Sequence, residues 1–345
     1  MNINFIFLEM THLRYYAPLV TEARKRGLKC IFYTGASNKY NCPLLHLDEL
    51  KKYAQENFVY IRPISEVQKA EGILFINEKT GVEFLDRINP SVKIIATTYQ
   101  TDFIESFKAY IDKVDHVLMP SKFCAEYYNL TNKKNLYLGI PKYDVKLQSR
   151  DILKKYKLKK GKRALLMMPK GRDEAASNWW DISDYLNSLG YTTLFKTRGK
   201  DPIVNFYINT KNDFPKLAAQ KGDVCFEDPS WFPHTTQELL EVSDVVINFG
   251  STTIEECVMH DTPVINFDIK PAIRNGSKRP YRVTHEYLYN YDYCVQLKTD
   301  CSLGNFTAAI EYLTKTDLKK EFKKARKEHL FDHKNCCKKI FDVIL

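Results

Sequence analysis

The sequence lacks the cysteine patterns that would assign it to a disulfide-rich or zinc-binding class. It has nine cysteines, but no CxxC pair and no spacing typical of a zinc site. Cys336 and Cys337 are adjacent and cannot readily pair with each other. An odd number of scattered cysteines indicates reduced, mostly buried thiols, so we expect a cytosolic protein.

Long apolar runs, a targeting segment, internal repeats and low-complexity segments are also missing. The opening stretch MNINFIFLEM has no basic n-region and no cleavage site, and its apolar run is too short to span a membrane. We therefore expect these residues to form the first strand of the fold.

The charge balance is basic but lacks the pattern of a nucleic-acid protein. Lys and Arg number 52 against 42 Asp and Glu, which gives a net charge of +10. Part of the excess lies in Lys154–Arg163 and Lys319–Lys327. Neither a basic stripe with interleaved aromatic residues nor a known nucleic-acid module is present, so we expect no nucleic-acid partner. An anionic small ligand, peripheral docking at an acidic membrane surface and a simple solvated helix face remain as alternatives.

What is present is an alternation of short apolar runs with amphipathic stretches. The length of 345 residues favours two domains, and 44% apolar with 27% charged residues is ordinary for a globular protein. Alternating strands and helices predict an α/β fold with parallel sheets covered on both faces. The expected strands are Asn4–Leu8, Cys30–Thr34, Val59–Ile61, Gly72–Ile76, Lys93–Thr97, His116–Pro120, Asn135–Leu138, Arg163–Met168, Thr192–Lys196, Val224–Phe226, Asp244–Asn248, Val264–Phe267 and Tyr293–Leu297.

The expected helices lie between these strands. They are Tyr15–Arg26, Ile104–Ile111, Trp179–Leu189, Thr236–Val242, Thr253–His260 and Phe306–Leu313, with two more near the C-terminus. A polar basic helix near residue 150 precedes a new buried strand, and this change marks the boundary between the two domains. We predict two doubly wound Rossmann-like domains, 1–150 and 151–345, that face each other across a cleft, with the last helix packing back on the first domain. Ligands of such sheets bind outside the carboxyl ends of the strands.

The most informative stretch is VVINFGSTTIEECVMHDTPVINF, residues 245–267. It reads as a strand, a tight turn, a helix and a second strand. Gly250 allows an unusual backbone conformation or a close approach, and the three hydroxyl residues 251–253 can cap the helix or hold a phosphate oxygen. Glu256 lies further into the helix, where a carboxylate can accept both hydroxyls of a ribose. The alternative is that this segment is an ordinary capped helix with acidic residues in its first turn, and no ligand site.

The segment Phe232–Phe267 resembles the donor-binding region of GT-B glycosyltransferases, with their "aDvvit" strand, small-residue turn, acidic helix and "g.PvI.f" strand. The resemblance implies that Glu256 binds the ribose, while Gly250, Ser251, Thr252 and Thr253 contact the diphosphate. It also implies that Glu255 lies on the helix surface or owes its place to the helix dipole. The turn GIPKYD, Gly139–Asp144, and the C-terminal segment resemble the CDP-glycerol glycerophosphotransferase group, and the turn is also similar to that of UDP-N-acetylglucosamine 2-epimerases.

Departures from both groups favour a sugar transferase. The glycerophosphotransferases carry a His in a "K.HP" strand end, where this sequence has FKTRGKD. The epimerases carry an "HR.EN" segment, where this sequence has MPKGRDEAA without a His. Both groups remain as alternatives.

A general base is expected in the loop after the first strand, because that loop faces the acceptor in many GT-B enzymes. His12 is the first candidate and Glu9 the second, since either side chain can take the proton of an acceptor hydroxyl. The alternative is that His12 caps the first helix and Glu9 pairs with Arg14. Asp102 is a further candidate that a helix-capping role explains better.

Cations are expected to stabilise the departing diphosphate, because no metal-binding motif is apparent. Lys170, Arg172, Lys196 and Arg198 follow predicted strand ends of the second domain, and Arg offers two-pronged phosphate contacts. Solvated surface positions explain them equally well.

The loop before the donor region is expected to surround the nucleotide base. Trp231 or Phe232 could stack on the base and His234 could reach a phosphate, with Thr235 as a further donor contact; core packing of the two aromatic residues is the alternative. Asp268, Lys270 and the loop Asn275–Arg282 are weaker candidates for sugar or acceptor contacts.

These observations predict a metal-independent GT-B glycosyltransferase. It would move a sugar from a nucleotide-sugar, UDP- or GDP-linked, to an acceptor hydroxyl of a glycan. It would be cytoplasmic, with peripheral contact at the inner face of a membrane left open. No cofactor other than the donor substrate is expected.

Overall fold

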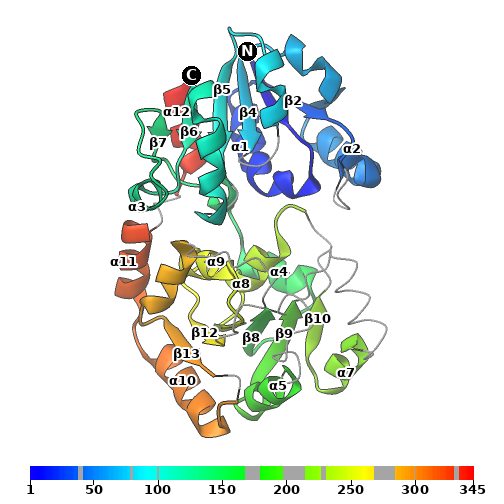
Figure 1. Cartoon of the computed structure of the whole chain (residues 1–345). Coiled ribbons are helices and arrows are strands. Elements are labelled where there is room, and N and C mark those ends of the chain that lie inside the picture. Colours follow the sequence, from blue (N-terminus) through cyan, green and yellow to red (C-terminus); the bar gives the residue numbers. More distant parts are fainter. Residues whose placement is uncertain are drawn as a thin grey trace, which may run out of the picture. The chain divides into compact units, whose positions relative to one another are not determined.

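The structure is a computed structural model that describes residues 1–37, 42–77, 81–98, 101–167, 179–196, 214–226, 231–267, 284–298, 300–329 and 334–345. These residues divide into two compact units (Figure 1). The first unit comprises Met1–Val145 and Lys327–Leu345, and the second comprises Lys146–Arg326. The C-terminal residues therefore belong with the first unit, whereas the sequence-based division assigned 151–345 to the second domain. No helix among the described residues is both long and apolar enough to cross a bilayer.

The first unit is built on a parallel sheet with the strand order β3-β2-β1-β4-β5-β6-β7. Its inner strands are apolar on both faces, as expected for a sheet covered on both sides; all five residues of β4 are buried. The strands are β1 (Asn2–Ile6), β2 (Lys29–Thr34), β3 (Val59–Pro63), β4 (Ile73–Asn77), β5 (Lys93–Thr97), β6 (His116–Leu118) and β7 (Asn135–Leu136).

Helices and 3-10 turns connect these strands. The α-helices are α1 (Leu13–Lys25), α2 (Leu47–Glu56), α3 (Lys122–Tyr127) and α12 (Cys336–Ile344). The 3-10 helices are η1 (Met10–His12), η2 (Pro43–His46), η3 (Ile64–Lys69), η4 (Val82–Arg87), η5 (Thr101–Ala109), η6 (Ile111–Lys113) and η7 (Pro141–Tyr143). The C-terminal α12 packs on α1, where Arg26 donates to Asp342 at 2.7 Å and to the carbonyl of Lys338 at 3.1 Å. These contacts place the last helix in the first unit.

The second unit repeats the architecture with the strand order β10-β9-β8-β11-β12-β13, again all parallel. Its strands are β8 (Lys162–Met167), β9 (Tyr191–Lys196), β10 (Val224–Phe226), β11 (Val245–Asn248), β12 (Val264–Phe267) and β13 (Cys294–Leu297). Its helices are α4 (Ser149–Lys155), α5 (Trp179–Ser188), α7 (Phe214–Gln220), α8 (Thr235–Glu241), α9 (Thr253–Met259), η9 (Thr284–Asn290), α10 (Leu303–Lys315) and α11 (Lys319–His329), whose last three residues fall in the first unit.

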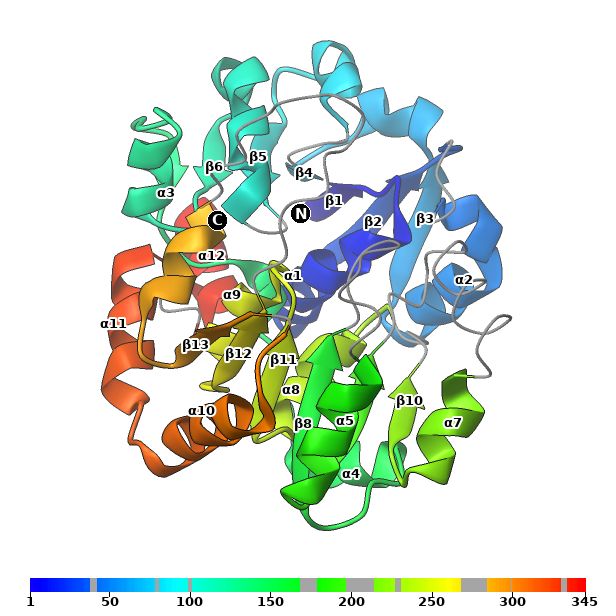
Figure 2. The ribbon, with the colours of Figure 1, turned by 60° about the horizontal axis from the view of Figure 1, so that its bottom comes forward.

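Two groups of helices cover the second sheet. Helices α5 and α10 contact each other and the strands, and they lie in front of the sheet in Figure 2. Helix α8 contacts both α4 and α9. The buried carboxylate of Glu238 fixes α4 to α8, because it accepts from the ammonium of Lys155 at 2.7 Å and from the hydroxyl of Tyr156 at 2.5 Å.

Each strand that the sequence predicts is present, with ends that shift by a few residues. The prediction of an α-helix over Ile104–Ile111 is wrong, because the helix there is of the 3-10 type. The chain there is wound as the 3-10 helix η5, and the following turn keeps the same tight pattern, with Tyr110 donating to the carbonyl of Phe107 at 3.0 Å. Helices α2, α3 and α7 were not predicted, and α3 is short enough to leave only a weak periodic signal.

The strand order reverses direction at one place in each sheet. In the first sheet this switch lies between β1 and β4, and in the second between β8 and β11. Chain segments that leave two neighbouring strands at such a point diverge to opposite faces and open a crevice at the carboxyl ends. The turns that follow β1, β4, β8 and β11 are therefore where a ligand site is expected in each unit.

Candidate functional site

The turn after β11 is held in a left-handed backbone conformation at Gly250. Its φ is +63°, and a Cβ placed there would meet no atom of the described residues within 4 Å. Glycine is needed here for the backbone angle, since an L-residue pays a steric cost in this region. Of the two reasons that the sequence offered for this glycine, the unusual angle is the one observed, and the space above the turn is open.

A polar network beneath the turn fixes its shape. The side-chain oxygen of Asn266, at the end of β12, accepts from the backbone N–H of Gly250 at 3.0 Å and from Nδ2 of Asn248 at 3.1 Å. The hydroxyl of Tyr289 accepts from Asn248 at 3.0 Å and donates to the carbonyl of Ser251 at 2.9 Å. Asn248 and Asn266 are buried, so these bonds are shielded from water and rigidify the turn.

Because of this network, some groups of the turn are already hydrogen-bonded and others can still bind a ligand. The N–H of Gly250 donates to Asn266, so it cannot make the expected phosphate contact in this conformation. The N–H groups of Ser251 and Thr252 donate to no residue that the structure describes. The hydroxyls of Ser251 and Thr253 lie 3.1 Å apart at the same place. The turn thus offers two backbone donors and two hydroxyls, which is the donor set that a phosphate group needs.

Both acidic residues of α9 are buried. Glu256 is 5% exposed and its Oε1 lies 3.9 Å from Nδ1 of His234, a separation suited to an ion pair rather than a hydrogen bond. Glu255 is 0% exposed. The expectation that Glu255 lies on the helix surface is therefore wrong, because α9 is enclosed by β11, α8 and η9 and has buried side chains all round.

Residues before α8 form one flank of this region. Trp231 is buried, while Phe232 is half-buried and keeps part of its ring accessible. Thr235 is completely buried, and its hydroxyl has no hydrogen-bond partner among the described residues. His234 occupies the N-cap position of α8 without using its side chain as a cap, which leaves the imidazole beside Glu256.

Of the four cations proposed for the diphosphate, the structure describes one. Lys196 is the last residue of β9 and is 4% exposed. Strand β9 is separated from β11 by β8 alone, so Lys196 lies two strand spacings, about 10 Å, from the end of β11 along the same edge. Lys170, Arg172 and Arg198 lie outside the described residues, as do Asp268, Lys270 and the loop 275–282.

The loop after β1 carries the two base candidates. His12 is 2% exposed, and its ring lies 5.8 Å from that of Phe7 and 5.6 Å from those of Tyr15 and Tyr16. It occupies the N-cap position of α1 but makes no side-chain cap bond, so the capping alternative is not observed. Glu9 is half-buried and accepts from the hydroxyl of Thr11 at 3.2 Å. Of the two, Glu9 has the more accessible side chain.

Sequence reasoning missed a buried cluster at the end of β4. The side chain of Asn77 is hydrogen-bonded to the hydroxyl of Tyr15, and the hydroxyl of Tyr110 donates to the carbonyl of Asn77 at 3.3 Å. This cluster joins α1 to the strand that neighbours β1 at the switch point. An asparagine at the end of an apolar run was the available signal, and the same signal marks Asn248 and Asn266 in the second unit.

A shallow depression of about 440 Å³ lies elsewhere in the first unit, lined by residues that include Lys113, His116 and Lys134. It sits at the amino ends of β6 and β7, opposite the edge where parallel sheets bind ligands. We give it no role in the site.

Comparison with known proteins supports the fold through structure alone. No protein-family model matches the sequence. No curated protein matches it either. Solved structures do: UDP-GlcNAc 2-epimerase from Methanocaldococcus jannaschii has a TM-score of 0.62 at 11% identity, covering 99% of both chains. The wall teichoic acid polymerase TagF has a TM-score of 0.61 at 12% identity over 99% of this chain and 87% of that one. A glycosyltransferase from Rickettsia africae has a TM-score of 0.54 at 13% identity, covering 99% and 97%.

These likenesses show a fold. The chain has two doubly wound parallel α/β units, the GT-B architecture that the motif of residues 232–267 predicted, and that prediction is confirmed. Identities of 11–13% carry no information on the substrate of this chain.

Proposed function

We propose that the protein is a glycosyltransferase that uses a nucleotide-sugar donor. The observation that carries the proposal is the open turn at the carboxyl end of β11. It presents the N–H groups of Ser251 and Thr252 and the hydroxyls of Ser251 and Thr253, and Glu256 lies buried one turn further on. The M. jannaschii epimerase has been solved with UDP-GlcNAc and UDP, so a protein of this fold binds the class of ligand that we propose.

In the proposed reaction the turn holds the diphosphate and Glu256 accepts the ribose hydroxyls. A base takes the proton of the acceptor hydroxyl, the hydroxyl oxygen bonds to the sugar carbon, and the bond from that carbon to the diphosphate oxygen breaks. The nucleoside diphosphate leaves with the electron pair of that bond. We propose that backbone N–H groups and Lys196 stabilise the charge that develops on it. Lys170, Arg172 and Arg198 remain proposed contributors, and we propose no metal.

The base is proposed to be His12 or Glu9, both in the loop after β1. Glu9 is half-buried whereas His12 is 2% exposed, so an acceptor hydroxyl reaches Glu9 more readily, which favours Glu9 in the observed conformation. His12 would have to move away from its aromatic neighbours, or the acceptor would have to reach it through them. Two single variants separate the candidates: the variant of the true base should keep nucleotide affinity and lose transfer, while the other should retain most of its rate.

The competing activities within this fold are 2-epimerisation of UDP-GlcNAc and transfer of a polyol phosphate from a CDP-linked donor. Neither is favoured by a residue of the described chain. We also propose a cytoplasmic location, where nucleotide-sugar donors are present, and leave membrane contact to experiment.

Thermal melting of the full chain with UDP, GDP, CDP, ADP and TDP and their sugars tests the proposal first. A ligand at 100 times its Kd stabilises the folded state by about 2.7 kcal/mol, which raises the Tm of a unit of this size by roughly 5–10 °C. A nucleotide-sugar that binds is then assayed with and without added glycan acceptors. Conversion without acceptor into the 2-epimer would replace the proposal by epimerisation, and no shift with any nucleotide would overturn it.

A further inference from the structure

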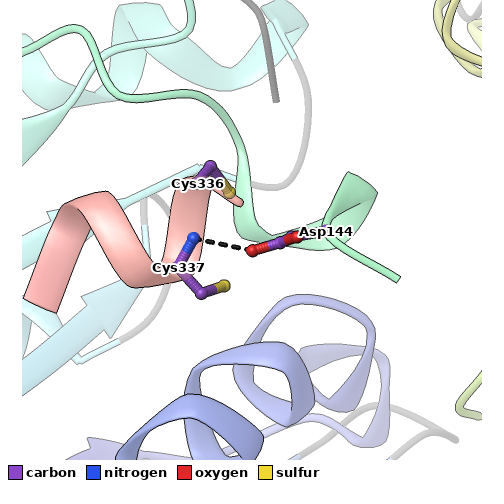
Figure 3. Close-up of side chains that lie close together, drawn as sticks. All are labelled: Asp144, Cys336 and Cys337. Carbon is purple, nitrogen blue, oxygen red and sulfur yellow. Dashed lines mark hydrogen bonds between the residues drawn. The ribbon is translucent and has the colours of Figure 1, made fainter. Parts of the chain in front are cut away.

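Asp144, Cys336 and Cys337 form a compact cluster in the first unit, remote in sequence from the proposed donor site (Figure 3). Asp144 follows the turn η7, and the two cysteines are the first residues of α12. The two sulfurs and one carboxylate oxygen lie within 4.8 Å of one another. Among the residues that the structure describes, no other group of three or more His, Cys, Asp or Glu side chains converges in this way.

The carboxylate of Asp144 is held in place by the helix. Its Oδ2 accepts the backbone N–H of Cys337 at 2.8 Å, as Figure 3 shows. The local N-cap residue, Asn335, adopts a left-handed φ of 56° and makes no side-chain cap bond. Asp144 therefore caps α12 from 193 residues away, and this uses only one of its oxygens.

The two thiols are not needed for this cap. Cys336 is completely buried and Cys337 is 3% exposed, whereas Asp144 is half-buried and offers the accessible side of the cluster. Burial, together with the neighbouring Cys336 and Asp144, raises the pKa of Cys337. A disulfide between the two is disfavoured, because adjacent Cα atoms lie about 3.8 Å apart and disulfides span about 4.4–6.8 Å.

We propose that this cluster binds a zinc ion through Sγ of Cys336, Sγ of Cys337 and Oδ1 of Asp144. Zinc takes Cys sulfur at about 2.3 Å and carboxylate oxygen at about 2.0–2.2 Å in a tetrahedral arrangement. Ligand atoms on one tetrahedral zinc ion lie roughly 3.5–3.8 Å apart. The two sulfurs and the carboxylate oxygen, now up to 4.8 Å apart, would therefore have to approach one another by about 1 Å to bind the ion. The N–H of Cys337 stays on Oδ2 and orients the carboxylate, as hydrogen bonds to the far side of a ligand commonly do.

The chemistry of the site follows from its ligands. Two thiolates and one carboxylate suit zinc and its heavier analogue cadmium better than calcium or magnesium, which prefer oxygen alone. The two thiol protons leave to solvent as the ion binds, and no oxidation is involved. A water molecule on the side of Asp144 completes the tetrahedron. The ion would link α12 to the chain segment that ends the first unit, which is a structural role independent of sugar transfer.

The test uses the purified full chain after treatment with a chelator. Titration with cadmium should give a thiolate charge-transfer absorption that saturates at one equivalent. X-ray absorption on the zinc-loaded protein should find two sulfur neighbours at about 2.3 Å, with oxygen completing the shell. The proposal would be refuted if X-ray absorption found a number of sulfur neighbours other than two, or if cadmium gave no charge-transfer band. Neither result depends on a variant.

Variants then locate the ion. Asp144→Asn keeps an acceptor for the N–H of Cys337, so it preserves the cap while it should weaken zinc affinity at least about tenfold. The double variant Cys336→Ser, Cys337→Ser should abolish the cadmium band. Cys30→Ser and Cys294→Ser, which change two buried thiols elsewhere, should leave it intact. A band that survives the double variant, or that is lost in a control, would place the metal elsewhere and refute the proposal.

Discussion

The two units share the order of their first six strands, with one more strand in the first sheet, but they differ at the glycine that follows the fourth strand. Strands β4 and β11 both end in an asparagine that is buried and hydrogen-bonded to a tyrosine hydroxyl. In the first unit the glycine of the next segment, Gly81, is packed, since a Cβ there would lie 2.9 Å from Cγ2 of Ile6. In the second unit no described residue lies within 4 Å of a Cβ at Gly250.

The difference between the two glycines indicates which of the two units is suited to bind a ligand at this position. Both glycines have positive φ, so the backbone angle alone does not separate them. What separates them is whether the space beside the turn is filled by an apolar side chain or left open next to polar donors. We therefore propose that the second unit binds a ligand at this turn, and that the first unit does so only at the loop after β1.

The greatest loss of stability is expected when a methyl group is added at Gly81, where the space is already occupied by Ile6. Gly81→Ala should lower the free energy of unfolding by about 2–5 kcal/mol, because left-handed strain of about 1–2 kcal/mol adds to an overpacking cost of about 1–3 kcal/mol. Gly250→Ala should cost only the strain, about 1–2 kcal/mol, and should also weaken nucleotide binding. Urea denaturation of both variants measures the difference. Equal losses would show that the two turns are packed alike.

The next effect concerns the buried carboxylates of the second unit. Glu256→Gln should weaken nucleotide affinity about 10- to 100-fold, because charge-assisted hydrogen bonds to the ribose contribute about 1.5–3 kcal/mol. Calorimetric titration with the best nucleotide from the melting panel provides the measurement.

Glu238→Gln is the matched control for that experiment. Glu238 is equally buried but is held by Lys155 and Tyr156, so its change should reduce stability by about 1–2 kcal/mol and leave nucleotide affinity within twofold. An unchanged affinity in Glu256→Gln, or a large loss in Glu238→Gln, would contradict the assignment of the ribose contact.

A smaller effect is expected from single hydroxyls in the two switch regions. Tyr289→Phe removes the bridge between Asn248 and the carbonyl of Ser251, which is worth about 1 kcal/mol, so nucleotide affinity should fall about 3- to 10-fold. Tyr110→Phe removes the corresponding bond to Asn77 in the first unit and should not change that affinity. If both variants bind nucleotide like the unmodified protein, the network beneath the turn does not position the donor.

The smallest effect is a pH dependence in the second unit. The hydrogen bond from His260 lowers the pKa of Glu241 below its ordinary value of 4.5, and a second bond from Ser149 acts the same way. A lowered carboxyl pKa stabilises the fold above the unfolded value and loses that contribution as pH falls.

Glu241→Gln should therefore be less stable than the unmodified protein at pH 6, by under about 1 kcal/mol for this partly exposed pair. The difference should shrink as the pH drops below about 4.5, the ordinary value for this group. Urea unfolding at several pH values checks this. A difference that grows toward acid pH would have the wrong sign.

The fold was predictable because apolar runs mark its strands directly. Segments such as VVIN and VINF are buried on both sides, and their spacing around Gly250 also gave the turn and its hydroxyls. The remaining features depend on contacts between distant segments. Tyr289 reaches Ser251 across 38 residues, and Asp144 reaches Cys337 across 193. No local pattern encodes such approaches.

Burial was the other quantity that the sequence could not supply. Glu255 and His12 look like surface groups when read alone, yet one is enclosed by neighbouring helices and the other by three aromatic rings. Whether a polar residue is accessible depends on what packs over its element. Burial in the loop after β1 is likewise the reason that we propose Glu9 ahead of His12 as the base.

Hydrogen–deuterium exchange with and without the best nucleotide of the melting panel would locate the donor site on the chain. We expect slower exchange at the amides of Ser251 and Thr252 in the turn after β11, with no change in the segment from Gly81 to Arg87. Protection in that first-unit segment instead, or no protection at Ser251 and Thr252 under saturating nucleotide, would contradict the assignment of the donor site to the second unit.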